Sequence, residues 1–556
     1  MIRLDISGPT TSERHAPLGK SMDDSARHPL LDSLDEDQRE VAQQLRGPVA
    51  VIAGPGSGKT RVISHRIAYG VAMGVYDPAK VLALTYTNKA AAELRTRMRA
   101  LGVPGVSVRT FHAAALSQLQ FFWPQLTGAQ APRLAPSKLA LLREAAESQR
   151  IRLDQDQFFA IQSRLEYYRY TLTDPSDDNF VPIGTVQFEQ FLALSDSYQA
   201  LKRDRKLIDW EDAVSLAAGM FRSEPQLLEQ FRQQYRFFTV DEYQDISALQ
   251  QALLETWLDD REDVCVVGDP RQTIYSFAGA NPEFLMRFSD RFPAADVFEL
   301  NRNYRSSIEI VEYANRILGP DQVAQRTLSS RPRFVEYPTV SAEAQAISLR
   351  VSALLREGVE PGEIAVLVRS NHQIEAIENE LTEQGIPTLV RGAGRFFAKP
   401  EVVQAMHALR ALTVTDLEKP TFAAVSDVLR SLGWRTEGSG ESWESLNWFI
   451  TVLDELGGNP AVADYVRELQ ERERSGHEPA INAVTLATIH STKGLEWRCV
   501  FVASVSDSVF PPARSAQEQF AEERRLFFVA VTRAQELLEI SFSSDRGRSP
   551  LLGSHS

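Results

Sequence analysis

Cysteine is nearly absent from this sequence, which has two in 556 residues. Cys265 and Cys499 both lie in apolar, strand-like runs, so we expect two buried small hydrophobic residues and neither a disulfide nor a metal site. No apolar run approaches the roughly 18 residues of a membrane-spanning helix, and the N-terminus lacks the pattern of a signal peptide. These absences predict a cytoplasmic protein with no membrane partner.

An excess of basic residues is also missing, because 60 Lys and Arg stand against 74 Asp and Glu, for a formal net charge of −14. This balance argues against a basic surface over the whole protein. It leaves room for a local basic groove, since affinity for nucleic acid follows the few residues that face the phosphates. Composition is therefore neutral about partners, and the length predicts about three or four compact units.

The clearest motif is a glycine-rich stretch after a short β-branched run, Val49 to Ile52, which is typical of a buried parallel strand. Glycines let a backbone curl until its N–H groups surround phosphate oxygens, with a helix N-terminus behind them. Lys59 would then reach the β- and γ-phosphates, and the Thr60 hydroxyl would hold Mg²⁺. The alternative is a glycine-rich turn before a surface helix. The predicted loop consists of Ala53, Gly54, Pro55, Gly56, Ser57, Gly58, Lys59 and Thr60.

Strand-like runs alternate with helical segments along most of the chain, which predicts an α/β fold with mostly parallel sheets. Two long helical blocks interrupt this alternation, so we expect two sheets that each carry one helical insertion. The expected strands of the first sheet are 49–52, 81–87, 236–242 and 263–269, and those of the second are 364–368, 484–488, 500–503 and 537–541.

Two adjacent carboxylates, Asp241 and Glu242, follow the strand-like run that ends at Val240. In a doubly wound sheet they would lie at the same edge as the phosphate loop. Asp241 would hold Mg²⁺ and Glu242 would orient and polarise an attacking water, as phosphoanhydride hydrolysis requires. The alternative is that these carboxylates cap a helix after a strand.

The motifs, in this order, resemble those of the UvrD/Rep/PcrA-type DNA helicases of superfamily 1A, from about Leu34 to Arg548. Any one motif is weak, whereas the ordered set is specific. The matching segments are Gln38-Arg39, 53–61, 85–91, 110–112, 268–277, 301–306, 488–497, 522–526 and 531–534.

The resemblance implies two RecA-like motor domains in tandem, ATP and Mg²⁺ as cofactors, and roles for single residues. Gln272 would sense the γ-phosphate, and Arg305 and Arg533 would act as arginine fingers from the second domain. Alone, each arginine could instead form a surface salt bridge. The implied nucleoside contacts are Gln38, Arg61 and Tyr304 on the adenine and Glu496 on the ribose.

The resemblance also divides the chain into domains. The predicted units are a flexible N-terminal extension at 1–31, a first motor domain at 32–112 and 207–299, its helical insertion at 113–206, a second motor domain at 300–399 and 480–545, its reduced helical insertion at 400–479, and a polar tail at 546–556.

On the DNA side, the resemblance implies contacts to single-stranded DNA and to junctions of single- and double-stranded DNA. Aromatic side chains can stack on bases without sequence preference. A core position remains an alternative for Tyr86 and Phe111, and a structural hydrogen bond remains one for His490. The expected DNA contacts are Tyr86, Thr87, Asn88, Thr110, Phe111, His112, Tyr275, Phe277 and His490.

Two departures from the family pattern affect the expected activity. Phe277 and Ala278 stand where the family usually has Trp and Arg, which predicts weaker DNA affinity or stepping. The second insertion is about half the usual length, and only Leu432-Gly433-Trp434 stands where relatives have a duplex-binding Gly-Ile-Gly turn.

Three functions fit these observations. The first is an ATP-dependent single-stranded DNA translocase and helicase with 3′-to-5′ polarity. The second is a motor subunit that unwinds weakly alone and works with a nuclease or another protein partner. The third is a nucleotide-gated DNA-binding scaffold, although a scaffold would need neither Glu242 nor the two arginine fingers.

Overall fold

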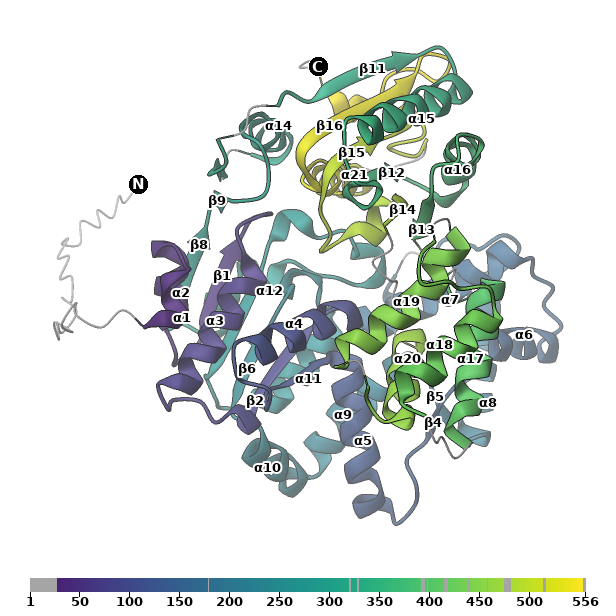
Figure 1. The fold of residues 1–556 in the computed structure, drawn as a ribbon. Coiled ribbons are helices and arrows are strands. Elements are labelled where there is room, and N and C mark those ends of the chain that lie inside the picture. The colour runs from purple at the N-terminus through teal and green to yellow at the C-terminus, as the bar shows by residue number, and fades with distance from the viewer. Residues whose placement is uncertain are drawn as a thin grey trace, which may run out of the picture.

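The structure is a computed structural model, and it describes residues 28–553 except 179, 320–321, 328–329, 392–395, 398, 415–418, 439–440, 458, 475–481 and 514–516. Two six-stranded sheets form its framework, and every strand pair within them is parallel. Figure 1 shows the second sheet above the first. The predicted α/β class with two parallel sheets is confirmed.

The first sheet has the strand order β3-β2-β6-β7-β1-β8. Four strands were expected from buried β-branched runs, and the structure adds β3 and the edge strand β8. The carboxyl ends of β1, β7 and β6 are neighbours at one edge, where a doubly wound sheet binds ligands. The strands are β1 (Val49–Ala53), β2 (Val81–Thr85), β3 (Ser107–Thr110), β6 (Phe237–Val240), β7 (Val264–Gly268) and β8 (Asp296–Leu300).

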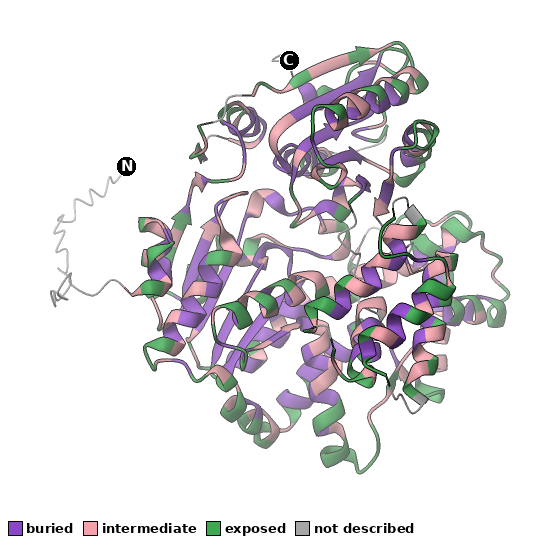
Figure 2. Ribbon diagram, viewed as in Figure 1, coloured by how far each residue is buried: buried purple, intermediate pink, exposed green. Residues whose placement is uncertain are grey.

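Helices cover both faces of this sheet, because alternate strand residues point to opposite sides. Val49 and Val51 pack with one set of helices and Ala50 with the other. In Figure 2 the strands are largely buried between these layers. The first set is α2 (Glu36–Gln43), α3 (Lys59–Ala72) and α4 (Asn88–Ala100); the second is α5 (Phe111–Thr127), α9 (Trp210–Ser223), α10 (Pro225–Gln234) and α11 (Ala248–Leu258).

The second sheet repeats this arrangement with the order β11-β16-β15-β12-β14-β13. Helices α15 (Val340–Arg356) and α16 (Ile374–Glu383) cover one face, and α14 (Ile308–Leu318) and α21 (Gln517–Val531) cover the other. The strands are β11 (Arg333–Tyr337), β12 (Ile364–Val368), β13 (Thr388–Arg391), β14 (Val484–Thr488), β15 (Trp497–Val502) and β16 (Ala534–Ser543).

Two helical units have apolar cores of their own. The first consists of α6 (Lys138–Ser148), α7 (Gln155–Thr171) and α8 (Phe188–Asp204). The second consists of α17 (Pro400–Ala411), α18 (Thr421–Ser431), α19 (Glu441–Glu455) and α20 (Val462–Arg474). The first unit begins later than the predicted residue 113, because α5 packs into the core of the first sheet.

Short elements complete the described chain. Two small parallel pairs are β4 (Arg133–Leu134) with β5 (Leu207–Ile208) and β9 (Arg302–Asn303) with β10 (Val323–Ala324). Two short helices, α12 (Glu283–Met286) and α13 (Phe288–Arg291), precede β8. Within the part of the chain that the structure describes, no helix is long and apolar enough to cross a membrane.

Both predicted chain ends need correction. Residues 1–27 of the expected N-terminal extension lie outside the described residues, but Pro29–Asp32 forms helix α1 and Leu31 is buried. At the other end, Pro550–Leu552 forms a short 3₁₀ helix whose Leu552 packs into the core of the second sheet. The expected polar tail is therefore wrong over these residues, because two leucines in an otherwise polar segment suffice to attach it.

A candidate nucleotide site between two sheets

The loop after β1 has the backbone that close approach to phosphate requires. Gly56 and Gly58 have φ values of 71° and 82°, in the left-handed region that favours glycine. Lys59 begins α3, and its Nζ donates to the carbonyls of Ala53 (2.8 Å) and Gly54 (3.1 Å). Burial lowers the pKa of Lys59, against the opposing charges of Glu242 and Asp269. The loop thus holds its own lysine across the place predicted for phosphate.

The two predicted carboxylates lie beside this loop, at the end of β6. The Thr60 hydroxyl donates to Oδ2 of Asp241 over 3.4 Å. Burial and then the adjacent Glu242 raise the pKa of Asp241. Burial alone would also raise the pKa of Glu242, but Lys493 and Lys59 outweigh it and hold that pKa below its ordinary value. Glu242 therefore keeps its negative charge at neutral pH.

The backbone of Glu242 is unusual, with a φ of 54° in a residue that is not glycine. Such a conformation costs about 1–3 kcal/mol and persists only where surrounding contacts impose it. Gln244 supplies one of these contacts, because its Nε2 donates to Oε2 of Glu242 over 2.6 Å. Its Oε1 accepts the backbone N–H of Asp269 over 3.0 Å, so Gln244 connects the ends of β6 and β7.

We call the part of the protein around each six-stranded sheet a lobe, the first around β1 and the second around β12. Gln272, at the end of the 3₁₀ helix η4 (Pro270–Gln272), is held by residues of both lobes. Its Nε2 donates to Oδ2 of Asp269 over 2.8 Å. Its Oε1 accepts a hydrogen bond of 3.0 Å from Arg533, and its backbone carbonyl accepts one of 2.8 Å from Lys493. Lys493 also forms an ion pair with the buried Asp245. Gln272 is thus one of the residues at which the two lobes meet.

Arg533 is 2% exposed, and its guanidinium also donates to the carbonyls of Val529 and Leu495, each over 3.0 Å. Burial, reinforced by the nearby Arg305, lowers the pKa of Arg533 to about 9. Arg305 donates from Nε to Oε2 of Glu496 over 2.5 Å. Glu496, the expected ribose contact, is therefore engaged by a predicted arginine finger.

Residues of the second lobe close over the phosphate loop. Asn303 donates to the carbonyl of Pro55 over 2.9 Å, and the backbone N–H of Tyr304 donates to the carbonyl of Gly56 over 2.9 Å. A methyl group on Gly56 would lie 2.8 Å from side-chain atoms of both Asn303 and Arg305. Glycine is needed here for close approach as well as for its φ.

The predicted adenine contacts gather around the start of α2. Gln38 completes a capping box with Asp35 and donates from Nε2 to the Ser57 carbonyl over 2.8 Å. Arg61 donates to the Ser33 carbonyl over 2.5 Å, and the Tyr304 hydroxyl bonds to the carboxylate of Asp35. The structure thus brings Gln38, Arg61 and Tyr304 to one rim of the loop.

Four of the predicted DNA contacts form a connected group between the lobes. The rings of Tyr86 and Tyr275 are stacked, with centroids 5.2 Å apart, and the Tyr275 hydroxyl donates to the carbonyl of His490 over 3.0 Å. Phe277 lies edge-on to His490 at 5.9 Å and is 60% exposed. Burial lowers the pKa of His490 to about 4, so this ring is neutral at pH 7.

The prediction for Phe111 is wrong. Its side chain is 1% exposed and stacks on Trp257 in the core of the first sheet, so it cannot meet a base. Thr110 and Thr87 are occupied as helix caps, accepting the N–H groups of Ala113 and Ala90.

His112 and Asn88 differ in their surroundings. Asn88 is exposed at the first turn of α4. His112 is partly buried, and its Nε2 lies 3.1 Å from the Tyr170 hydroxyl of the first helical unit.

Sequence reasoning missed several residues of the site. Lys493 stands in the matching segment 488–497 and Asp245 stands three residues after Glu242, but their ion pair joins residues 248 positions apart. Gln322 belongs to no motif, yet a methyl group on Gly54 would lie 2.0 Å from its Nε2. The one signal in the sequence that could have assigned any of these residues to the site is the position of Lys493 between His490 and Glu496, which were both predicted to belong to it.

This arrangement, a glycine-rich loop and two carboxylates on one parallel sheet with arginines from a second sheet beside them, is typical of ATP-hydrolysing proteins. Comparison with known families gives the same answer. Residues 34–293 match the UvrD/REP helicase N-terminal domain, and residues 298–438 and 414–545 match the UvrD-like helicase C-terminal domain. The chain belongs to the UvrD-like family of ATP-dependent DNA helicases, as its motifs predicted.

Individual relatives cover nearly the whole chain. It is 38% identical to the ATP-dependent DNA helicase UvrD2 of Mycobacterium tuberculosis, over 94% of this chain and 80% of the relative. It is 27% identical to DNA helicase II of Escherichia coli, over 93% of this chain and 85% of the relative. It is 25% identical to the ATP-dependent DNA helicase PcrA of Staphylococcus epidermidis, over 93% of this chain and 84% of the relative.

Proposed function

We propose that this protein hydrolyses ATP between its two motor lobes to move along single-stranded DNA with 3′-to-5′ polarity, and so separates duplexes. The observation that carries the proposal is the bonding of Gln272, whose side chain meets Arg533 of the second lobe while its backbone meets Lys493. Three residues further on is Tyr275, in the group of predicted DNA contacts. A change at the γ-phosphate that moves Gln272 would therefore reach Tyr275 through three residues of backbone.

The catalytic roles follow from charge and position. Glu242 stays ionised and is positioned by Gln244, which suits a residue that orients the attacking water. Lys59 would leave its loop carbonyls for the phosphates. Arg305 and Arg533 would offset the charge that develops on the γ-phosphoryl group, a contribution of roughly 10³–10⁵ in rate in related reactions. Because both arginines come from the second lobe, hydrolysis would require the lobes to be closed.

The residues present fit ATP with Mg²⁺. Thr60 and Asp241 place two hard oxygen atoms 3.4 Å apart beside the loop. Mg²⁺ prefers oxygen ligands and takes only one or two from the protein when it binds with phosphates. Among the described residues no group of three or more Asp, Glu, His or Cys side chains is placed to hold a metal ion, so no site made of protein ligands alone is found there. When bound, the metal would neutralise phosphate charge.

Nucleoside binding would use the rim around α2. Tyr304 is 42% exposed and Arg61 is exposed, so the faces of both planar groups are accessible to an adenine ring while their polar ends are bonded to Asp35 and Ser33. Gln38 is held by its capping box and would present its carboxamide to the base edge. Glu496 would contact the ribose after exchanging its ion pair with Arg305.

A specific observation favours the second candidate, a motor whose unwinding depends on a protein partner. Trp434, which stands in the place of the family's duplex-binding turn, is 5% exposed and donates from Nε1 to Asn447 over 3.2 Å. It belongs to the core of the α17–α20 unit and is not available to a duplex. Translocation would survive this change, whereas duplex engagement would need help.

Strand displacement separates these proposals. The purified protein would be given ATP, Mg²⁺ and a fluorescent duplex that carries a 3′ single-stranded tail, a 5′ tail or no tail. Displacement from the 3′-tailed duplex alone supports the helicase proposal. Stimulated ATP turnover without displacement supports the partner-dependent motor. Preferential opening of the 5′-tailed duplex would overturn the proposed polarity.

A further inference from the structure

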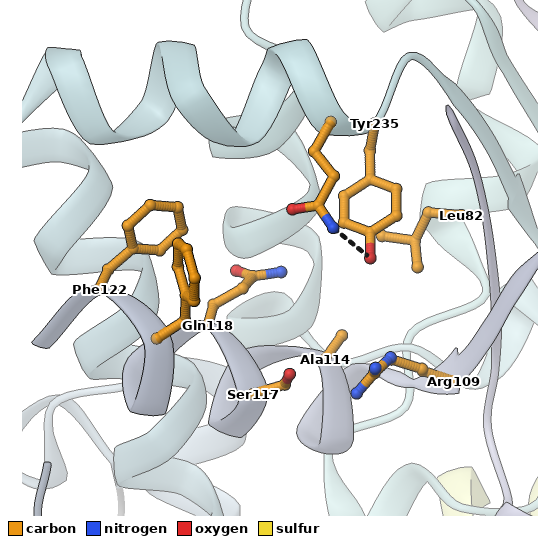
Figure 3. Close-up of a pocket in the computed structure, with 9 residues that line it drawn as sticks. Leu82, Arg109, Ala114, Ser117, Gln118, Phe122 and Tyr235 are labelled. Carbon is orange, nitrogen blue, oxygen red and sulfur yellow. Dashed lines mark hydrogen bonds between the residues drawn. The ribbon is translucent and has the colours of Figure 1, made fainter. Parts of the chain in front are cut away.

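A cavity lined by none of the residues of the nucleotide site lies between α5, α10 and strands β2 and β3 of the first sheet. It measures about 230 Å³ and is shown in Figure 3. This volume is below the ~300–1,000 Å³ of pockets that hold drug-sized ligands, so it suits a single amino-acid residue. One wall is apolar, because Phe122, Leu82 and the 63% exposed Phe121 line it.

Two polar side chains of the lining, Arg109 and Gln118, present hydrogen-bond donors. Arg109 projects from β3 toward the cavity, and among the described residues its guanidinium has no ion pair or hydrogen-bond acceptor. Gln118 is 8% exposed, and its Oε1 accepts the indole N–H of Trp257 over 3.0 Å. Because an indole nitrogen only donates, this bond fixes the carboxamide and leaves Nε2 of Gln118 as a donor directed into the cavity.

The lining contains no Asp or Glu, although the protein as a whole carries a net charge of −14. An unpaired guanidinium beside a buried amide donor is a site for an anion, and a planar carboxylate matches its two-pronged geometry. The Phe121 and Phe122 side chains offer edges and faces for a second aromatic ring. The cavity thus combines a carboxylate site with an aromatic one inside a one-residue volume.

We propose that this cavity binds the C-terminal residue of a partner protein, an aromatic residue with its free carboxylate. A terminal residue carries ring and carboxylate on one Cα atom, so both fit the volume together. An internal acidic segment would need two residues and room for the chain on both sides. The carboxylate would pair with Arg109 and Gln118, and the ring would lie against Phe121 and Phe122.

The test uses the full chain without ATP or DNA, so its outcome is independent of motor activity. Three fluorescein-labelled peptides are titrated and followed by anisotropy: Ser-Gly-Ser-Gly-Phe with a free carboxylate, the same peptide as its C-terminal amide, and Ser-Gly-Asp-Phe-Ser-Gly-amide. We expect saturable binding of the free acid and affinities about 10-fold weaker or more for the other two, because neither of them carries the charged terminal carboxylate that Arg109 and Gln118 would bind.

Two variants and one control locate the binding. Arg109→Gln and Phe121→Ala should each weaken the free-acid peptide about 10-fold, with thermal unfolding checked for both. Arg99→Gln removes an exposed arginine of α4 outside the cavity and should leave affinity unchanged. Equal binding of acid and amide, full affinity in Arg109→Gln, or no saturation up to about 1 mM would each overturn the proposal.

Discussion

Replacing Arg533 tests the proposed link between the lobes most sharply. Its guanidinium donates to Gln272 across the lobes and to two carbonyls within its own lobe. Truncation in Arg533→Ala removes the only contact that the described structure gives to the side-chain oxygen of Gln272. It also leaves the Val529 and Leu495 carbonyls without a charged donor in a buried place.

Two effects of this truncation can be given magnitudes. Loss of an arginine finger lowers kcat roughly 10³–10⁵-fold, which corresponds to about 4–7 kcal/mol of transition-state stabilisation. Leaving a buried carbonyl without a hydrogen-bond donor destabilises a protein by about 1–3 kcal/mol for each group. Arg533→Lys keeps the charge but not the planar fork, so we expect intermediate losses of both rate and stability.

The assay is steady-state ATP turnover with saturating single-stranded DNA, run well below the unfolding temperature of each variant. Nucleotide affinity, measured with a fluorescent ATP analogue, should change far less than kcat. Arg498→Ala is the matched control, because Arg498 is 41% exposed in its side chain and, among the described residues, pairs with the partly exposed Glu363 and Glu536. If Arg533→Ala folds and keeps more than about a tenth of the wild-type kcat, the finger assignment is refuted.

Three further outcomes follow from the site. Glu242→Gln should bind ATP with near-normal affinity yet hydrolyse it very slowly in single-turnover experiments; normal turnover would remove its assigned role. Phe277→Ala should lower single-stranded DNA affinity by about 1–3 kcal/mol in anisotropy titrations, whereas Phe422→Ala, a change of an exposed phenylalanine on α18, should not. Burial, and then Lys138, lowers the pKa of His112 from 6.5 to about 4, so protonation favours the unfolded chain and stability should fall as pH drops between these values. The free energy of unfolding would be measured with urea at about pH 7 and at about pH 4.5. Between these pH values His112→Gln should lose about 2 kcal/mol less of it than the wild type, and equal losses would contradict this.

The sequence predicted the interior of the fold better than its borders. β1, β2, β6 and β7 are buried on both faces, so each appears as a continuous apolar run. The edge strand β8, Asp296–Leu300, has mostly exposed side chains and therefore no such signal. Edge strands are fixed by pairing with a neighbour, and that information lies elsewhere in the chain.

In the candidate site, too, local features were predictable from the sequence and contacts between distant segments were not. Residues that act locally, such as the glycines of the phosphate loop and Glu242, stand in recognisable order along the chain. Contacts between distant residues were not accessible, as with Lys493 and Asp245 or Gln322 near Gly54. Phe111 shows the opposite error, because a residue within a DNA-contacting motif is used for the core.

Dependence of ATP turnover on single-stranded DNA tests the central claim most directly. The wild-type protein would be measured with Mg²⁺ and ATP over a range of oligonucleotide concentrations, with Glu242→Gln as the inactive control. Coupling through Gln272 predicts that DNA raises kcat strongly and saturably, and that Glu242→Gln shows no stimulation. Wild-type turnover that is unchanged by single-stranded DNA would contradict a motor that joins hydrolysis in the cleft to movement on DNA.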